Sequence, residues 1–146
     1  MLLIDKNKID ISNIRKIINK LSTKEKEYIG NGYWVDSDHV IYRKIKYLDK
    51  EPVAFIDVYL LPKYKRTGLI IIAATKESRG KGIAKSLVNS AISNLKNNKE
   101  IDALRWLADY DNLPSINLAK SLGFEYKGKT KDNCIEFIYN FKREME

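Results

Sequence analysis

The stretch Ile70–Leu87, with the sequence IIIAATKESRGKGIAKSL, joins an apolar run to a glycine-containing turn and then to a helical pattern. The apolar run Leu69–Ala74 lacks the alternation of a half-exposed strand, so it predicts a central strand buried on both faces. Gly80 and Gly82 allow the turn to adopt positive φ and to approach a ligand closely. The following helix begins with unpaired N–H groups and the positive end of its dipole. This junction therefore predicts an anion-binding turn.

Two other phosphate-binding motifs do not fit this turn. A P-loop that ended on Lys85-Ser86 would require glycine at positions 79 and 84, where the chain has arginine and alanine. A dinucleotide-binding GxGxxG that began with Gly80 and Gly82 would require a third glycine where Lys85 stands. A simple strand–turn–helix connection with two glycines remains the alternative to an anion site.

The composition of the chain limits its class. Its 146 residues are typical of one domain, so we expect residues 1–146 to form a single domain. No apolar run approaches the roughly 18 residues that span a bilayer, and the N-terminus does not resemble a secretory signal, so we expect a cytoplasmic protein without a membrane partner. The single cysteine, Cys134, and the single histidine, His39, argue against a metal site, and we expect none.

Positive charge is concentrated in the same region. The chain has a net charge of +8, and residues 63–85 carry seven Lys and Arg side chains against Glu77 alone. This excess suits a phosphate-bearing partner such as a nucleotide, a phosphorylated cofactor or nucleic acid. Nucleic acid is the unlikely member of this group, because the sequence contains no helix-turn-helix, zinc or RNP motif. A solvated, lysine-rich surface is the other interpretation.

The periodicity of apolar residues predicts four helices and six strands. The helices are expected over residues 11–21, from Thr23 to a stop at Asn31-Gly32, from Ile83 to Asn97-Asn98, and over 113–122, and the strands over 39–48, 53–60, 69–74, 101–108, 124–127 and 134–141. Residues 49–52 are expected to form the turn of an antiparallel hairpin. This order predicts an α/β (α+β) fold with a mixed, mainly antiparallel sheet flanked by helices.

Two sequence blocks together resemble the GNAT N-acetyltransferase superfamily. Arg79, Gly82 and Ala84 fit the acetyl-CoA signature [Q/R]-x-x-G-x-[G/A], between a predicted strand and a predicted helix. The segment from Asn112 to Phe124, NLPSINLAKSLGF, is similar to the N-x-x-[A/S]…L-G-F block of that family. The resemblance covers residues 39–141, and it implies the GNAT-like acyl-CoA N-acyltransferase fold.

The resemblance also implies a co-substrate, a reaction and a set of binding residues. In that family the strand before the signature is bulged and splays from the next strand, and the pantetheine arm of acetyl-CoA lies in the gap. The implied cofactor-binding residues are Ile72, Ala73 and Ala74 for the pantetheine, Arg79, Gly80, Lys81, Gly82, Ile83 and Ala84 for the pyrophosphate, and Asn112 for the pantetheine arm. Asn112 is also a good helix cap, and the two roles are compatible. The implied reaction is direct attack of a primary amine, small molecule or peptide, on the acetyl thioester in a ternary complex. Homodimers are common in that family, so the resemblance also suggests a homodimer.

The catalytic side chains usual in that family are missing. Many members have a tyrosine acid at the position of Ala119, and some have a glutamate base at the position of Leu107. Substitute candidates are Asp57, Tyr59, Asp109, Tyr110 and Glu77, and solvent is an alternative base. Residues 32–39 are expected to contribute to the acceptor pocket. A catalytically silent CoA-binding or protein-interaction module on the same fold is the alternative to an enzyme.

Overall fold

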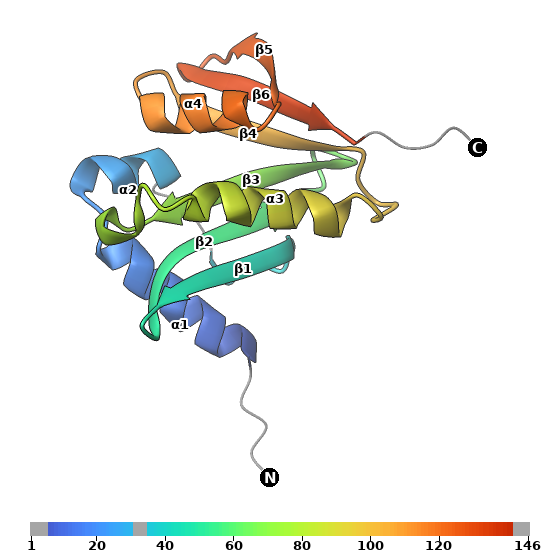
Figure 1. Cartoon of the computed structure of the whole chain (residues 1–146). Helices are drawn as coiled ribbons and strands as arrows, with labels where there is room; N and C mark the ends of the chain where they lie inside the picture. The colour runs from blue at the N-terminus through green and yellow to red at the C-terminus, as the bar shows by residue number, and fades with distance from the viewer. Residues whose placement is uncertain (1–5, 31–34, 142–146) are drawn as a thin grey trace.

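A computed structural model describes residues 6–30 and 35–141 of the chain. It contains a six-stranded sheet and four α-helices (Figure 1). The elements are α1 (Lys6–Asn19), α2 (Thr23–Ile29), β1 (Val40–Leu48), β2 (Glu51–Tyr59), β3 (Thr67–Ala74), the 3₁₀ turn η1 (Lys76–Ser78), α3 (Ile83–Leu95), β4 (Ala103–Asp109), α4 (Leu113–Ser121), β5 (Glu125–Lys129) and β6 (Cys134–Asn140).

The strands lie in the order β1-β2-β3-β4-β6-β5. All neighbours are antiparallel except β3 and β4, which are parallel because α3 connects them. The predicted element order and the mixed, mainly antiparallel sheet are therefore confirmed.

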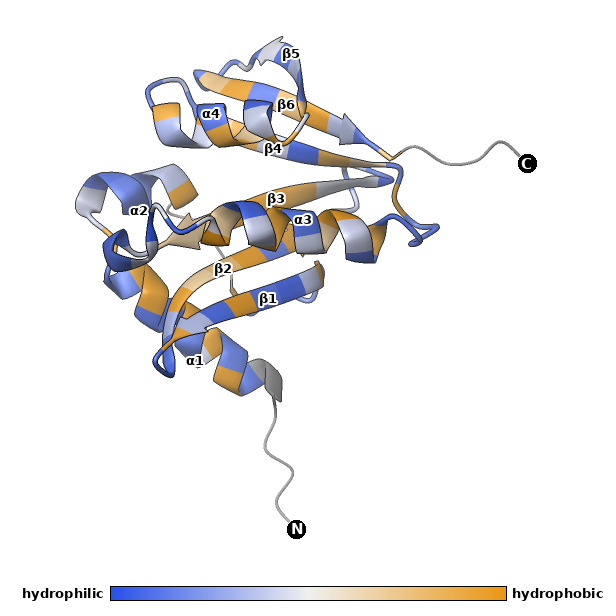
Figure 2. Cartoon of the chain, viewed as in Figure 1, coloured by the Kyte–Doolittle hydropathy of each residue, from blue (hydrophilic) through white to orange (hydrophobic). Residues whose placement is uncertain are grey.

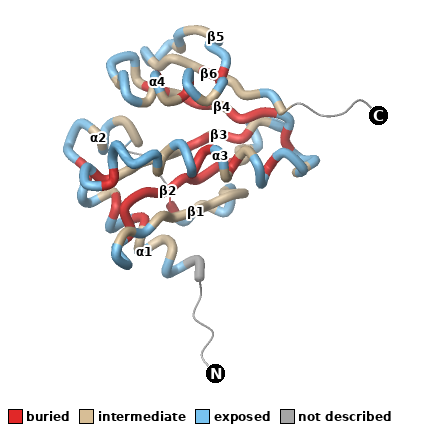
Figure 3. Tube along the Cα trace, in the orientation of Figure 1, coloured by how far each residue is buried: buried red, intermediate tan, exposed pale blue. Residues whose placement is uncertain are grey.

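Helices cover both faces of this sheet. The side chains of α3 and α4, among them Leu87, Val88 and Ile116, pack with β2 and β4 in one large core cluster. On the opposite face, Ile14 and Ile17 of α1 pack against Phe55 of β2. Figures 2 and 3 show that the apolar and buried parts of the chain coincide on the central strand β2, whereas β3 is apolar but for the most part only partly buried.

The first two helices differ from their predicted limits. Helix α1 extends to Lys6, well before the first apolar residue of the predicted pattern at Ile11, and Lys8 and Ile9 in this added part are exposed. It ends at Asn19 rather than residue 21, because Ser22 caps α2 through a reciprocal bond with Glu25. Helix α2 ends at Ile29, and Gly30 with φ 95° terminates it. The stop predicted at residues 31–32 lies outside the described residues.

The hairpin turn is shorter than predicted. Asp49 and Lys50 both have positive φ and form a two-residue connection, since Leu48 pairs directly with Glu51. Pro52 is therefore already part of β2. A register shift between Lys46 and Tyr47, opposite Pro52, accommodates the missing N–H.

Strands β3 and β4 pair only at one end. Their register runs from Thr67↔Ala103 to Leu69↔Arg105, and beyond that point the two strands separate. Each remains paired on its other side, β3 with β2 as far as Ala74 and β4 with β6 as far as Asp109. The expected splay is therefore present. The expected bulge is not, because the register of β3 with β2 runs without a shift, and β3 keeps that ladder while β4 follows β6 away from it.

Among the residues that the structure describes, no helix is both long and apolar enough to cross a membrane. The limits of the remaining helices and strands agree with the sequence-based expectations to within about two residues. The assignment of residues 1–146 to one domain stays a prediction.

Candidate functional site

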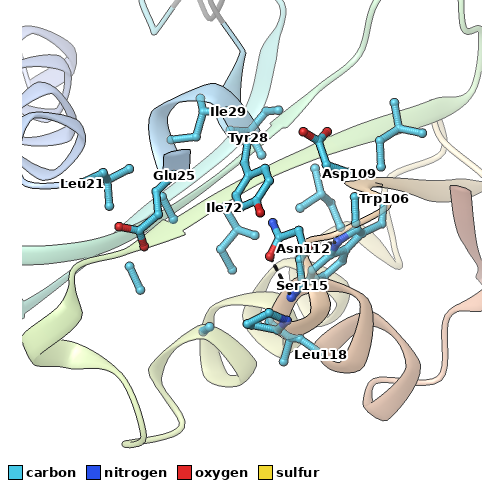
Figure 4. Close-up of a pocket in the computed structure, with 18 of the residues that line it drawn as sticks. Leu21, Glu25, Tyr28, Ile29, Ile72, Trp106, Asp109, Asn112, Ser115 and Leu118 are labelled. Carbon is cyan, nitrogen blue, oxygen red and sulfur yellow. Dashed lines mark hydrogen bonds between the residues drawn. The ribbon is translucent and has the colours of Figure 1, made fainter. Parts of the chain in front are cut away.

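A cavity of about 450 Å³ opens where β3 and β4 separate. Ile70–Ala74 form one wall and Trp106–Asp109 the other, while α2 and the start of α4 close the sides. Figure 4 shows side chains from these elements converging on a common space. Its lining has an apolar body with a few polar groups, as in small-molecule sites generally.

The cavity exposes backbone groups on its strand walls. The Thr75 N–H bonds the Val53 carbonyl of β2 at 2.8 Å, and alternate residues of a strand direct their backbone groups to opposite sides. Ile71 and Ala73 therefore face β2, whereas Ile72 and Ala74 direct their backbone groups into the gap, beyond the last pairing of β3 with β4 at Leu69↔Arg105. Of the three strand residues expected to bind pantetheine, Ile72 and Ala74 thus present backbone groups to the cavity, and Ala73 contributes to its lining.

The wall formed by β4 follows the same alternation. The Tyr110 N–H bonds the Asn133 carbonyl at 3.0 Å, toward the β6 side. Leu107 and Asp109 consequently direct their backbone groups toward β3. The cavity thus lies between two strand edges that direct backbone groups toward it, although the Ala74 carbonyl accepts from Arg79 and the Asp109 carbonyl accepts the Asn112 N–H.

The predicted anion-binding turn lies at the end of β3. Gly80 and Gly82 have φ of 77° and 75°, and a Cβ built at either position would meet open space. The Ser86 N–H makes the first backbone bond of α3, to Gly82, so the amides of Ile83, Ala84 and Lys85 precede the helical ladder. This turn fits a pyrophosphate, because it combines unpaired amides, left-handed glycines and open space at the positive end of a 13-residue helix.

The positive charge of residues 63–85 does not form one patch. Strand β3 separates Lys63, Lys65 and Arg66 at one end from the α3 turn at the other, and eight strand residues span about 26 Å. Arg66 is also paired with Asp102 at 2.6 Å. The interpretation of the whole segment as one cationic field is therefore wrong: only Lys76, Arg79, Lys81 and Lys85, offset by Glu77, lie at the anion-binding turn.

Arg79 is held by groups that the sequence did not predict. Its guanidinium donates to the Ala74 carbonyl at 2.9 Å and to the carboxylate of Glu25 on α2. Arg79 thus bridges the end of β3 and the first turn of α2. Both Arg79 and Glu25 line the cavity.

Asn112 begins α4 at the far side of the cavity. Its side-chain oxygen accepts the Ser115 N–H at 3.4 Å, as expected for a helix cap, and its side chain lies in the cavity (Figure 4). The Trp106 indole donates to Ser115 Oγ at 2.9 Å and fixes this corner. The cap role is confirmed, and the pantetheine role stays a prediction.

Asp57 and Tyr59, two of the candidate catalytic residues, lie away from the cavity on β2. Asp57 is fully buried and forms a two-point ion pair with Arg43, with both N–O distances at 2.7 Å. The Tyr59 hydroxyl lies 3.5 Å from the same carboxylate. Both residues are thus part of an internal polar cluster that joins β1 and β2.

Asp109 is the candidate that the structure places in the cavity. The Cys134 thiol donates to its carboxylate at 3.4 Å, and burial together with Asp109 raises the pKa of Cys134. Tyr110 is 61% exposed, and Glu77 lies 3.9 Å from Lys20 on the surface. Neither contributes to the cavity lining.

The two positions left without a catalytic side chain have different surroundings. Leu107 lines the cavity, whereas Ala119 is completely buried in the main core. The structure therefore leaves space for a reacting group beside Leu107 but none at Ala119.

Helix α2 contributes residues that sequence reasoning missed. Tyr28 projects from it into the cavity, with its hydroxyl toward Asn112 (Figure 4). Lys24 forms an ion pair with Asp111 at 3.2 Å, and Asp111 also interacts with the Tyr28 hydroxyl. Removal from water, then Asp111, raises the pKa of Tyr28. The sequence of α2 gave no indication that Tyr28 lines a cavity, because the cavity exists only where the distant strands β3 and β4 separate.

The segment expected to form the acceptor pocket is partly outside the described residues, which exclude 31–34. Within residues 35–39, Val35 is buried against α1 and its carbonyl accepts from Arg43. His39 is exposed, and its carbonyl accepts the Leu60 N–H at 2.9 Å. These residues support the sheet, and their role toward an acceptor stays a prediction.

A family model described as "Acetyltransferase (GNAT) family" matches residues 13–124, well over half of the chain. The chain belongs to the GNAT acetyltransferase family. No curated protein matches its sequence significantly.

Solved structures of low sequence identity share the fold. The chain is similar to the ribosomal-protein-S18-alanine N-acetyltransferase from Escherichia coli, with 16% identity, coverage of 94% of this chain and 92% of that one, and a TM-score of 0.69. It is also similar to a spermidine N-acetyltransferase from Vibrio cholerae in complex with CoA and spermine, with 14% identity, 90% coverage of both chains and a TM-score of 0.72. A GNAT acetyltransferase from Streptococcus pneumoniae gives 13% identity, 90% and 94% coverage and a TM-score of 0.72.

Proposed function

We propose that this chain is an acetyl-CoA-dependent N-acetyltransferase that acts on a primary amine. The observation that carries the proposal is one cavity that exposes the edge of β3 at Ile72 and Ala74 and reaches Arg79 and Ala84, which flank the left-handed Gly80–Gly82 turn before α3. An extended pantetheine arm with a pyrophosphate at one end matches these two features in shape and in hydrogen-bonding capacity.

The chain supplies most of the binding groups from the backbone and a few from side chains. The amides of Ile83, Ala84 and Lys85 and the turn at Gly80–Gly82 hold the pyrophosphate, with Arg79 and Lys81 adding charge. The edge of β3 pairs with the pantetheine arm, and Asn112 reaches it from α4. Acetyl-CoA supplies the activated acetyl thioester. A backbone N–H of the β3 edge polarises the thioester carbonyl and stabilises the developing oxyanion.

The acceptor amine approaches from the side of α2 and β4. It must be neutral to attack, and a lysine-type amine has a pKa near ~10.4 while an α-amine has one near ~8. Asp109 is the carboxylate in the cavity that is available to take up the proton. Positioning the amine against the thioester supplies much of the remaining acceleration. The acceptor is a small-molecule or peptide amine.

A catalytically silent CoA-binding module is the second candidate function. The observation that favours it is the combination of Leu107 and Ala119 at the two positions where relatives carry their base and acid. Such a module would bind CoA and leave every amine unmodified.

The test is a thermal-stability titration of the wild type and Gly82→Trp with acetyl-CoA. We expect a ligand-dependent shift in the wild type that Gly82→Trp loses, because the indole fills the space beside the α3 amides. Gly123→Trp is the matched control, since Gly123 has a similar φ of 85° and equally open surroundings but lies outside the cavity. Both variants pay a similar backbone strain of about 1–2 kcal/mol, and circular dichroism verifies that each folds.

No shift in the wild type would overturn the proposal. If Gly82→Trp still shows the acetyl-CoA-dependent rise in unfolding temperature, the ligand does not bind at the α3 turn. If acetyl-CoA binds, a panel of amines that includes spermidine and a peptide with an N-terminal alanine then separates the two candidate functions. Acetylated product excludes the silent module, and its absence across the panel favours it.

A further inference from the structure

The departing CoA thiolate needs a proton donor, and few residues of the described cavity lining are able to serve. The lining residues with an ionisable group or a hydroxyl are Glu25, Tyr28, Arg79, Asp109 and Ser115. Glu25 and Arg79 are paired with each other. Ser115 accepts the Trp106 indole, and its aliphatic hydroxyl is a far weaker acid than a phenol, while Asp109 accepts the Cys134 thiol and is assigned to the amine proton. Tyr28 is the remaining candidate.

Helix α2 holds Tyr28 over the gap by contacts to both walls. Glu25 binds Arg79 at the end of β3, and Lys24 binds Asp111 at 3.2 Å just beyond β4. These ion pairs lie one turn of helix from Tyr28, and they tether α2 across the diverging strands. Figure 4 shows the phenol ring projecting from α2 into the cavity, with its hydroxyl toward Ile72 and Asn112.

The surroundings of Tyr28 keep its proton in place. Loss of hydration and the carboxylate of Asp111 raise its pKa above the usual value of about 10, while Lys24 opposes the shift. The phenol is therefore protonated throughout the neutral range. Lys24 and the Tyr28 hydroxyl in turn lower the pKa of Asp111, so that this carboxylate stays ionised beside the phenol.

We propose that the Tyr28 hydroxyl is the general acid of the transfer reaction, taking from α2 the role that the tyrosine at position 119 has in relatives. This inference rests on the proposed function. The amine nitrogen forms its bond to the acetyl carbon, the C–S bond breaks with its electron pair on sulfur, and the thiolate takes the Tyr28 proton. Water at the Asp111 side of the cavity reprotonates the phenolate, and the excess proton of the new amide leaves to Asp109 and solvent.

The experiment compares the wild type, Tyr28→Phe and Tyr126→Phe. Tyr126 is the matched control, because it is 59% exposed on β5 and away from the cavity lining. Three quantities are measured for each protein: the Kd of acetyl-CoA, kcat with spermidine or with water as acceptor, and the pKa of the enzyme-bound CoA thiol from thiolate absorbance. The last quantity needs neither an acceptor nor turnover.

For Tyr28→Phe we expect kcat to fall about 100-fold or more, in the range typical of a lost acid, with the Kd of acetyl-CoA within threefold of the wild type. We also expect the pKa of the bound thiol to rise, because the thiolate loses its hydrogen-bond donor. Tyr126→Phe should resemble the wild type in all three.

Two results would overturn the inference. One is an unchanged kcat and thiol pKa in Tyr28→Phe, and the other is a loss of acetyl-CoA binding that accounts for the whole fall in activity. Failure of the proposed function is distinguishable from both, because the wild type itself would then bind no acetyl-CoA or, as a silent module, bind it without acetylating any amine.

Discussion

The two sides of the cavity differ in how they are built. On the β3 side, the proposed ligand-binding groups belong mainly to the backbone: the strand edge at Ile72 and Ala74 and the amides around Gly82. On the α2 and β4 side, the chemistry depends on side chains such as Tyr28 and Asp109. The first side contains the short sequence pattern that resembles the family signature, whereas Leu107 on the second side and Ala119 in the core stand where the resemblance implies a base and an acid. A binding site made of backbone groups thus requires a fixed sequence pattern, whereas a catalytic side chain can be supplied by any helix or strand that lines the same cavity.

The largest expected effect concerns a residue that lies on neither side. Asp57→Ala should lower the free energy of unfolding by about 3–5 kcal/mol, because it leaves the Arg43 charge without its buried partner. Asp102→Ala is the matched control: Asp102 also forms a two-point pair with an arginine, Arg66, but both side chains are about half exposed. Its loss should cost about 0.2–1 kcal/mol. Urea denaturation measures both values.

Equal effects of the two substitutions would show that the Asp57 pair is not a buried support of the sheet. Acetylation measured below the unfolding midpoint gives a second comparison. If Asp57→Ala kept wild-type stability and lost activity, Asp57 would belong to the reaction side and our placement of it would be wrong.

A smaller loss of stability is expected when a tyrosine is placed at position 119, where the resemblance implies the usual general acid. Ala119→Tyr should lower stability by about 1–3 kcal/mol, since Ala119 is completely buried and the added ring must displace packed neighbours. It should leave kcat no higher than in the wild type. Thermal denaturation and a single-turnover assay measure the two quantities, and a stable variant with raised kcat would show that the acid was never relocated.

The features that the sequence predicted correctly lie mostly on the β3 side of the cavity, where local backbone conformation decides the structure. The strand–turn–helix order around Gly80–Gly82 and the cap at Asn112 were predictable, because glycine at positive φ and a capping side chain act locally. The role of Tyr28 and the burial of Asp57 were not, since each depends on which distant segments meet. The charge of residues 63–85 was misread for a related reason: a linear segment contains both ends of β3, and only the fold separates them.

The smallest expected effect tests the link between the two sides. Glu25→Gln should tighten acetyl-CoA binding about two- to fivefold, because it releases Arg79 from an exposed ion pair worth up to about 1 kcal/mol. Glutamine keeps the capping box with Ser22, so α2 should remain folded. Glu27→Gln is the control, because Glu27 lies 3.9 Å from Lys24 and away from Arg79. Isothermal calorimetry at low salt measures the affinities for acetyl-CoA. Equal affinities for Glu25→Gln and Glu27→Gln would contradict the idea that Glu25 and the ligand compete for Arg79.

Residue-resolved hydrogen exchange of the β3 amides tests the central claim most directly. In the free protein, Ile71 and Ala73 should exchange slowly because they bond to β2, while Ile72 and Ala74 should exchange fast because they face the gap. Saturating acetyl-CoA should then protect amides of the second group and those of the α3 turn. Fast exchange at Ile71 and Ala73, or added protection confined to residues outside the cavity, would contradict the account.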